Sequence, residues 1–519
     1  MDTFIHKFGS KINGWITGFD RLVFKGMIRP LMFPAGAQLF LGTRGILNKN
    51  YKCWMLAQTR ELIEAVDQYA RNACGEKIIP IPSSHDRKDK IAQGRQREAG
   101  ISSGLIGVWS CVEAGTTYRA TFDRVAGFPQ LRMNNGRCKH LYFYYDHPTY
   151  GFMSVRLQTW FPFSIQIAVN GREWLRRSLD AAGSAYLKHD NKFLDLADYT
   201  LAQQLLDKQL DTRWNEVLNA FLPEVFPTMT HIFGEELDYY WTVWQSEWAA
   251  DFIFDSPTTV TSLMDKLLRH ALLTGTSERV LRYMGKPVRP DGQPHPLANP
   301  EVLTRVQTWY DGARIRHWVD NNSVKAYNEW NVLRLEMTMN RPDRFKVMRH
   351  LEGRQDSPKQ RLPLRKGVAD LPLRALVAND VNRRFAEQLA TLKDETPVRE
   401  ILAQFGAHNH DGRRVRALEP LGKDAALLQA IADPALGVSG ITNKALQHEL
   451  RGTPWSNGKI DRALSARISR QLRLLRDHSV IRKLPRQNKY QLTEKGRKLT
   501  TLISVLLGAS SEQLLQFAA

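Results

Sequence analysis

The carboxyl-terminal quarter of the chain holds the pattern that most constrains its fold: two helices followed by a short basic hairpin. Residues 441–450 predict a compact helix, and Thr442 or Asn443 can cap its free backbone N–H groups. Residues 460–478 predict a longer amphipathic helix. Residues 480–492 form two strand-like runs around residues 485–488, whose composition suits a tight turn.

This order of elements predicts a winged-helix domain, in which the second helix carries one apolar and one basic face. At 3.6 residues per turn the apolar face consists of Leu464, Ile468, Leu472 and Leu475. The opposite face and the wing are cationic and polar. The side chains that we expect to contact a nucleic acid are Arg462, Arg467, Ser469, Arg470, Arg473, Arg476, Arg482, Lys483, Arg486, Asn488 and Lys489.

Charge supports the same reading. Residues 444–498 contain fifteen lysines and arginines against four acidic residues, and the whole chain has a net charge of +20. Such a balance favours a polyanionic partner. DNA and structured RNA agree equally well with this charge, because the phosphate backbone of either binds to a basic groove. The alternative is a solvated basic face on a domain that binds another protein.

The segment RLLRDHSVIRKLPRQNKYQLTEKGRKL resembles the winged-helix domains of the MarR and ArsR regulator families. The resemblance implies a winged helix-turn-helix fold for the last quarter of the chain. It also keeps open the alternative of a winged-helix transcription regulator.

Composition indicates a globular chain of three or four domains, with 519 residues of which 43% are hydrophobic. The four cysteines are far apart and form no CxxC motif, so neither a zinc ribbon nor a disulfide framework is indicated. The sequence shows no signal peptide and no apolar stretch that would span a membrane. We therefore expect a cytoplasmic protein without a membrane partner.

The predicted fold class is multidomain α+β. We expect an α/β domain at residues 1–125, a strand-rich region with flanking helices at 126–230, a helical region with a β-hairpin at 231–395 and a winged-helix domain at 396–519. Within these regions, 105–113 and 116–122 read as two paired strands, and helices dominate from 193 to 285.

Residues 323–340 read as a hairpin that turns near residues 329–331. Alternation points Arg334, Glu336 and Thr338 to one face of the second strand, and Lys325 and Tyr327 can join them from the first. This resembles the Tyr…Arg-x-Glu hairpin of rolling-circle replication initiators. The resemblance implies Tyr327 as a nucleophile and Glu336 as a metal ligand. The alternative is a structural hairpin whose charges pair with one another.

A second candidate site starts from carboxylates. Asp20 opens an early strand, Glu113 closes a buried-looking strand, and Glu247 and Asp251 have the spacing of one helix face. Converging carboxylates of this kind hold paired Mg²⁺ in phosphodiester-cleaving enzymes. Mg²⁺ is thus the cofactor expected if the chain is a nuclease.

Three other features have an ordinary structural explanation beside a functional one. Tyr240, Trp241, Trp244 and Trp248 read as an aromatic helix stripe, which is more typical of core packing than of base stacking. His140, Asp146 and His147 could hold a metal or be satisfied polar residues. His408-Asn409-His410 is treated as a coincidental match to a nuclease signature.

Four segments, 18–26, 150–175, 239–248 and 322–347, resemble a family of bacterial proteins, and this resemblance implies no particular activity. Together the patterns predict a nucleic-acid-binding protein of a mobile-element, replication or RNA-partnered system. The alternatives are a metal-dependent DNA-nicking or DNA-cleaving enzyme, with a site at Tyr327 and Glu336 or at Asp20 and Glu113, and a winged-helix regulator.

Overall fold

The computed structural model describes residues 1–510 except for 236, 287, 289–301, 310–311, 352, 355, 392–397, 411, 434–435, 437–439 and 486. The chain divides into two compact units. Unit 1 comprises Met1–Met264, Tyr283–Lys286 and Arg305–Ala386, and unit 2 comprises Asp265–Arg282, Pro287–Thr304 and Glu387–Ala519.

Unit 1 is built on an eleven-stranded sheet with the order β10-β11-β12-β13-β9-β1-β6-β5-β4-β3-β2. In chain order the strands are β1 Ile12–Ile28, β2 Ile79–Pro80, β3 Gly104–Asp123, β4 Phe128–His147, β5 Gly151–Gln158, β6 Ile165–Asn170, β9 Tyr239–Phe254, β10 Leu303–Trp309, β11 Gly312–Val319, β12 Asn322–Glu329 and β13 Val332–Met339. The regions 1–125, 126–230 and 231–395 thus contribute strands to one sheet, which confirms an α+β chain with a large central sheet.

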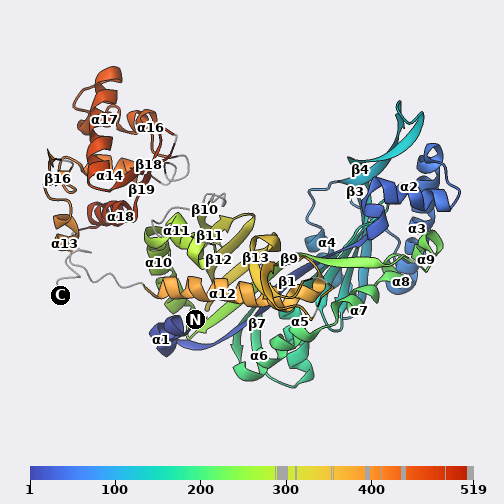
Figure 1. Ribbon diagram of the computed structural model, residues 1–519. Coiled ribbons are helices and arrows are strands. Elements are labelled where there is room, and N and C mark those ends of the chain that lie inside the picture. Colours follow the sequence, from blue (N-terminus) through green and yellow to red (C-terminus); the bar gives the residue numbers. More distant parts are fainter. Residues whose placement is uncertain are drawn as a thin grey trace. The chain divides into compact units, whose positions relative to one another are not determined.

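Strands β1 and β9 form the centre of this sheet and run side by side along most of their length (Figure 1). Their pairing is antiparallel and is interrupted by irregularities at Phe19/Arg21 and at Val23/Phe24. At the first of these, Asp20 is the extra residue of a β-bulge. A bulge turns a side chain away from the regular alternation, and bulges are common beside functional sites.

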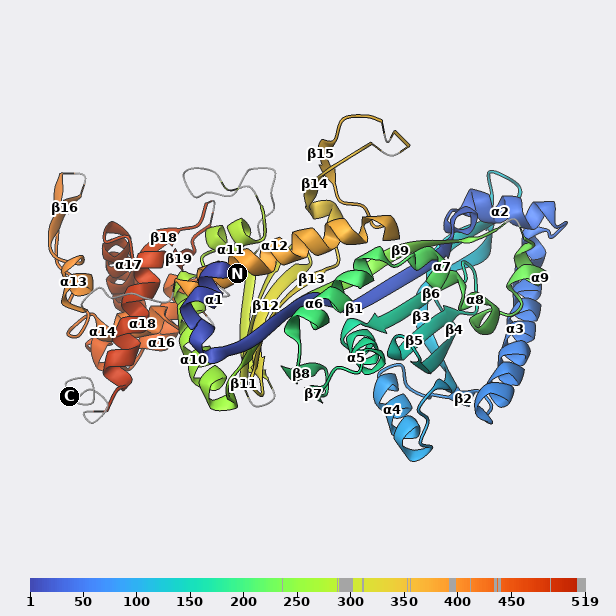
Figure 2. The ribbon, with the colours of Figure 1, turned by 90° about the horizontal axis from the view of Figure 1, so that it is seen from below.

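Helices and small hairpins cover the sheet of unit 1 (Figure 2). On one face, Asn382 of α12 (Leu371–Ala390) donates hydrogen bonds to the carbonyl oxygens of Trp248 and Leu335. The other helices with residues in unit 1 are α1 Asp2–Phe8, α2 Pro34–Thr43, α3 Tyr51–Cys74, α4 Lys88–Glu98, α5 Gly171–Ala181, α6 Tyr199–Asp207, α7 Trp214–Asn219, α8 Leu222–Val225, α9 Met229–Phe233, α10 Pro257–Thr274 and α11 Ser277–Tyr283. Two further hairpins are β7 Tyr186–His189 with β8 Lys192–Leu196, and β14 Lys346–Arg349 with β15 Gln360–Pro363.

The start of α5 lies directly against the bulged part of β1. An ideal Cβ built on Gly171 would come 1.8 Å from the carbonyl oxygen of Phe19, so only glycine allows this approach. Asn170 caps the helix by accepting from the backbone N–H groups of Arg172 and Glu173. The close approach places the fully buried side chain of Arg172 beside Asp20.

Unit 2 contains a core made by short helices and a small hairpin. Besides most of α10 and α11, its described elements include α13 Val398–Ala403, β16 His408–His410, β17 Arg413–Val415, α14 Ala425–Ile431, α16 Asn443–Leu450, α17 Asp461–Asp477, β18 Ile481–Lys483, β19 Tyr490–Leu492 and α18 Glu494–Gly508. Thr442 caps α16, since its side chain accepts from the N–H of Ala445. The apolar face predicted for α17 is confirmed, because Leu464, Ile468, Leu472 and Leu475 are all buried in this core.

Two local predictions are wrong. Residues 239–248, expected as an aromatic helix stripe, belong to strand β9, although helices dominate the rest of 193–285 as predicted. Because β9 is buried on both faces along its second half, it lacks polar alternation, and its aromatic residues happen to have helical spacing. Residues 105–113 and 116–122 do not pair with each other. They belong to one continuous strand, β3, which pairs with β4 along its whole length, and at the position of the predicted turn Gly115 lies opposite Gly136.

Within the described part of the chain, each helix is too short or too polar to span a lipid bilayer.

Candidate carboxylate site in unit 1

Three carboxylates from three neighbouring strands converge on one face of the central sheet. Asp20 comes from β1, Glu247 from β9 and Glu336 from β13, and one oxygen of each lies within 4.8 Å of the others. Asp20 and Glu336 are buried and Glu247 is half-buried. We call these three residues the carboxylate trio. Among the described residues they make up the one group of His, Cys, Asp or Glu side chains that meets so closely.

Strand register explains why the trio forms. Glu247 lies opposite Arg21 of β1 and Thr338 of β13, and Glu336 lies opposite the small residue Ala249. Residues directly opposite each other in antiparallel strands point to the same face. The bulge brings Asp20 to that face as well.

A buried ion-pair network borders the trio on one side. Arg334 donates to Asp20 at 2.8 Å and, through its Nη2, to Asp251 at 2.7 Å. Arg172 donates to Asp251 at 3.1 Å, and Asn191 donates to Asp20 at 2.9 Å. Burial alone would raise the pKa of Asp251, yet the charges of Arg334 and Arg172 lower it to about 2.

The other side of the trio is less completely neutralised. Lys325 lies 2.7 Å from Oε1 of Glu336, whereas the described residues provide no ion-pair partner for Glu247. Burial, and after it the charge of Glu336, raises the pKa of Glu247 to about 7. Beside it the hydroxyl of Thr338, a residue with 1% exposure, has no hydrogen-bond partner. A buried donor and an uncompensated carboxylate next to each other are what a bound cation and its water would satisfy.

The predicted hairpin at 323–340 is confirmed as β12 and β13. Tyr327 lies opposite Arg334, and Lys325 lies opposite Glu336, so these side chains share one face as the alternation predicted. The Tyr327 hydroxyl donates to Glu336 at 3.0 Å. Burial, and after it the charge of Glu336, raises the pKa of Tyr327 well above its usual value. The phenol is thus buried and hydrogen-bonded to the carboxylate of Glu336, and its role as a nucleophile stays a prediction.

Glu113 does not join Asp20. It lies on β3, four strand positions from β1 in the sheet order, which at about 4.8 Å per strand places it about 19 Å away. Its carboxylate pairs with Lys88 and Arg156, each at 2.9 Å, and accepts from the Tyr142 hydroxyl. The prediction that Asp20 and Glu113 share one site is therefore wrong, because Glu113 lies elsewhere on the sheet.

The residues that complete the trio were recognised only in part from the sequence. The spacing of Glu247 and Asp251 predicts one helix face, but the two lie on strand β9 and have different partners. The missing signal was the strand identity of β9, which its burial on both faces conceals. Asp146 belongs to no metal group either, since it pairs with Arg177 and accepts from Gln96.

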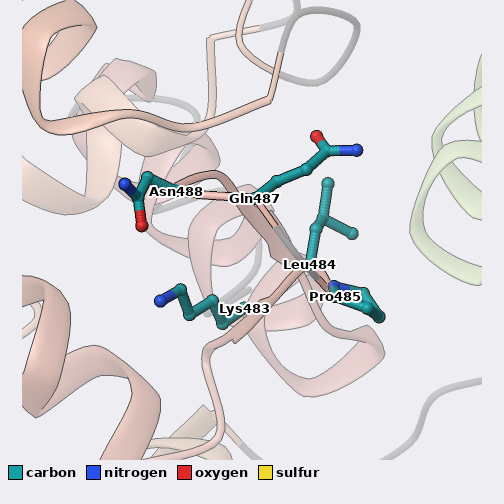
Figure 3. A pocket seen from close by; sticks show the side chains of 5 residues that line it. All are labelled: Lys483, Leu484, Pro485, Gln487 and Asn488. Carbon is teal, nitrogen blue, oxygen red and sulfur yellow. The ribbon is translucent and has the colours of Figure 1, made fainter.

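In unit 2 the residues expected to contact a nucleic acid lie mostly at the surface. Arg462, Ser469, Arg470, Arg473 and Arg476 of α17 and Arg482, Lys483, Asn488 and Lys489 of the hairpin are exposed. Arg467 is half-buried over the ring of Trp455 at 4.6 Å, and Arg486 lies outside the described residues. A pocket of about 490 Å³ lies at this hairpin. Figure 3 shows the side chains that line it, Lys483, Leu484, Pro485, Gln487 and Asn488.

No protein-family model matches the chain, and no curated protein matches it. One similar solved structure is the class II 3-hydroxy-3-methylglutaryl-CoA reductase from Streptococcus pneumoniae, bound to NADPH in open conformations. The identity is 10%, the match covers 91% of this chain and 80% of the reductase chain, and the TM-score is 0.18. A TM-score this low carries no argument for a reductase fold or activity here.

The comparisons give the functional expectation no support. The solved structure reported above is named as a reductase, and no family model or curated protein links this chain to nucleic acid. The predicted role in a mobile-element, replication or RNA-partnered system is therefore not carried further. The same holds for its alternatives, a DNA-nicking or DNA-cleaving enzyme and a transcription regulator.

Proposed function

We propose that the protein is a divalent-cation-dependent enzyme that acts on the phosphate ester of a small molecule, with its metal at the carboxylate trio. The observation that carries the proposal is the meeting of Asp20, Glu247 and Glu336 within 4.8 Å on the face of a sheet. Three carboxylates this close repel one another unless one of them takes up a proton or a cation lies between them.

The donor set indicates the class of metal. All three side chains offer hard oxygen ligands, which suit Mg²⁺ and Mn²⁺. The neighbouring cations do not neutralise the trio fully. Arg172 and Arg334 are paired with Asp251 and Asp20, and Lys325 with Glu336, which leaves Glu247 as the carboxylate without an ion pair among the described residues.

The rest of the face suits an anionic substrate. Lys325 and Arg316 lie opposite each other on β12 and β11, and Arg21 lies opposite Glu247. These three cations can bind the oxygens of a phosphate placed on the trio. Tyr327 holds Glu336 in place through its hydroxyl.

The reaction that this arrangement supports is hydrolysis of a phosphate ester. A water oxygen bonds to phosphorus, the bond between phosphorus and the ester oxygen breaks, and the departing alcohol receives a proton from the water. A bound Mg²⁺ would supply Lewis-acid stabilisation of the phosphate oxygens. Lys325 offers its ammonium group to the negative charge that develops on the leaving oxygen.

Binding of Mn²⁺ to the full chain, followed by electron paramagnetic resonance, tests the proposal. We expect the wild-type protein to bind Mn²⁺, and Glu247→Gln and Glu336→Gln to weaken the affinity by at least about tenfold, because each removes a charged ligand. Glu98→Gln, at an exposed site on α4, is the matched control and should bind as wild type does.

The chemistry has its own readout. With MgCl2 present, release of p-nitrophenol from p-nitrophenyl phosphate should depend on Lys325, so that Lys325→Met lowers kcat while the Mn²⁺ affinity stays within about threefold of wild type. Equal Mn²⁺ binding by wild type, Glu247→Gln and Glu336→Gln would show that the trio is no metal site.

We also propose a finer description of unit 2: that residues 441–498 adopt a winged-helix fold similar to that of the MarR and ArsR families. The order α16, α17, β18, β19 supports it, as do the shared apolar core and the bridge between Ile441 and Tyr490 that adds a third strand position beside the hairpin. This proposal concerns the fold and assigns no nucleic-acid role.

A further inference from the structure

Beside the carboxylate trio, the same sheet face carries a cationic site around the exposed ring of Trp244. The ammonium group of Lys25 lies 4.9 Å from the centre of this ring, and that of Lys366 lies 5.4 Å from it. Trp244 is 47% exposed, an unusual exposure for a tryptophan in the middle of a sheet. Two cations and one accessible aromatic ring are thus gathered at one place.

The backbone holds these groups in position. Lys25 lies on β1 opposite Thr242 of β9, and the Thr242 hydroxyl donates to the carbonyl oxygen of Lys25 at 3.0 Å. Lys366 lies in the segment that bridges to β9, since its carbonyl oxygen accepts from the N–H of Val243 at 2.7 Å. The site therefore does not depend on a loop that must move to form it.

The positive charge at this site lacks a counter-ion. No carboxylate among the described residues forms an ion pair with Lys25 or Lys366. Across the sheet, Lys25 shares a row with Gln166 and Arg156. Burial first, and then the positive charges of Arg156 and Lys366, lower the pKa of Lys25. Cations crowded without an anion between them favour an anionic ligand.

The aromatic surface continues beyond Trp244. Tyr240 is 38% exposed on the same strand, and the guanidinium of Arg29 stacks on its ring at 3.8 Å. An exposed ring flanked by cations binds the face of a flat group that carries negative charge.

The spacing to the trio follows from strand geometry. Arg21, which lies opposite Glu247, and Lys25 are on the same face of β1, four residues apart. At about 3.3 Å per residue the two positions are about 13 Å apart along the strand. One elongated molecule can therefore reach both.

We propose that the Lys25–Lys366–Trp244 site binds a second anionic group of the substrate, attached to a flat ring, while the reacting phosphate lies at the carboxylate trio. This inference rests on the proposed function and specifies its substrate class: an elongated phosphate ester with a ring and a further anionic group about 13 Å from the reacting phosphorus.

Binding of phenyl phosphate to the full chain in the presence of EDTA tests this site apart from the metal. Isothermal titration calorimetry should show that Lys25→Met combined with Lys366→Met weakens binding by about tenfold or more, because two charge-assisted contacts are lost. Trp244→Leu should weaken binding of phenyl phosphate by about fivefold and leave binding of inorganic phosphate nearly unchanged, because only the former has a ring to stack. Methionine preserves the aliphatic packing of half-buried Lys25.

The matched control is Lys208→Met, at an exposed position of the segment after α6, and it should bind phenyl phosphate as wild type does. Unchanged binding in the double lysine variant overturns the proposal, as does equal loss in Lys208→Met. Benzyl alcohol serves as the uncharged probe; binding as tight as that of phenyl phosphate would show an aromatic site that needs no anion, and would also overturn it. Because EDTA removes divalent cations, failure of Mn²⁺ binding at the trio leaves this result unaffected.

Discussion

The central sheet of unit 1 and helix α17 of unit 2 use their arginines in opposite ways. In unit 1, Arg334 of β13 and Arg172 of α5 are fully buried and neutralise Asp20 and Asp251, which lie far from them in sequence. In unit 2, Arg462, Arg470 and Arg473 are exposed on α17, whose apolar face is buried in the core. A buried charge needs its partner for the fold to form, whereas a charge on a solvated helix face can be lost with little effect on stability. The contrast makes the central strands of unit 1 sensitive to charge substitutions and helix α17 of unit 2 sensitive mainly to apolar ones.

The largest expected effect of a charge substitution is at Arg334. Arg334→Met leaves Asp20 and Asp251 buried with less compensation, and we expect it to lower the free energy of unfolding by about 3 to 5 kcal/mol. Tryptophan fluorescence during urea unfolding measures it, because twelve of the thirteen tryptophans lie in unit 1 and only Trp455 lies in unit 2.

The comparison between units supplies the control. Arg470→Met removes the same charge from the exposed face of α17 and should change the free energy of unfolding of unit 2 by less than about 0.5 kcal/mol, measured by far-UV circular dichroism during urea unfolding. If both substitutions have equally small effects, the buried network of unit 1 is not what holds its central strands together.

The second expected effect concerns pH and compares two buried histidines. His140 in unit 1 and His478 in unit 2 are both 2% exposed. Burial, and after it the charge of Arg156, lowers the pKa of His140 to about 4; Glu113 and the Cys138 carbonyl act in the opposite direction. Burial also lowers the pKa of His478, but its hydrogen bond to the Arg416 carbonyl counteracts the shift.

A histidine whose pKa is lower in the folded state takes up its proton more readily when unfolded. Unit 1 should therefore lose stability as the pH falls from about 6.5 through about 4, and the contribution of His140 to this loss should be about 3 kcal/mol. Urea unfolding at pH 7.5 and pH 4.5 measures it in wild type and in His140→Gln. In His140→Gln the loss of unfolding free energy between pH 7.5 and pH 4.5 should be smaller than in wild type by most of these roughly 3 kcal/mol. His478→Gln should reduce this loss by less. An identical pH dependence in wild type and His140→Gln would exclude this cause.

Local periodicity explains which parts could be predicted from the sequence. Helix α17 follows from the spacing of four apolar residues, and the β12–β13 hairpin follows from alternation on either side of a short turn. Both are decided by residues close in the chain. The sharing of one face by Lys325, Tyr327, Arg334 and Glu336 could be predicted for the same reason.

The carboxylate trio could be predicted only in part because it depends on long-range register. Arg334 and Asp20 are 314 positions apart in sequence, and the pairing of β1 with β9 joins residues as far apart as Lys25 and Thr242, 217 positions from each other. Burial on both faces removed the alternation that would have identified β9 as a strand. The bulge at Asp20 added a further shift that no periodic pattern reveals.

The smallest expected effects come from the helix caps and refine the comparison between units. Thr442 caps α16 with one hydrogen bond, from the N–H of Ala445 at 3.1 Å, so Thr442→Ala should cost about 1 kcal/mol. Asn170 caps α5 with two hydrogen bonds. It also donates a hydrogen bond to Asn191, which in turn donates one to Asp20. Asn170→Ala should therefore cost more than Thr442→Ala.

Hydrogen–deuterium exchange measures both caps in the intact chain, through peptides that span α16 and α5. Thr442→Ser keeps an oxygen in the capping position and should protect α16 nearly as wild type does. In Asn170→Ala the loss of protection should extend from α5 to β1 around Asp20, because the cap and the ion-pair network share Asn191. Loss confined to α5 would mean that the helix start and the carboxylate trio are energetically independent, and that the charged network of unit 1 is no more cooperative than the surface of unit 2.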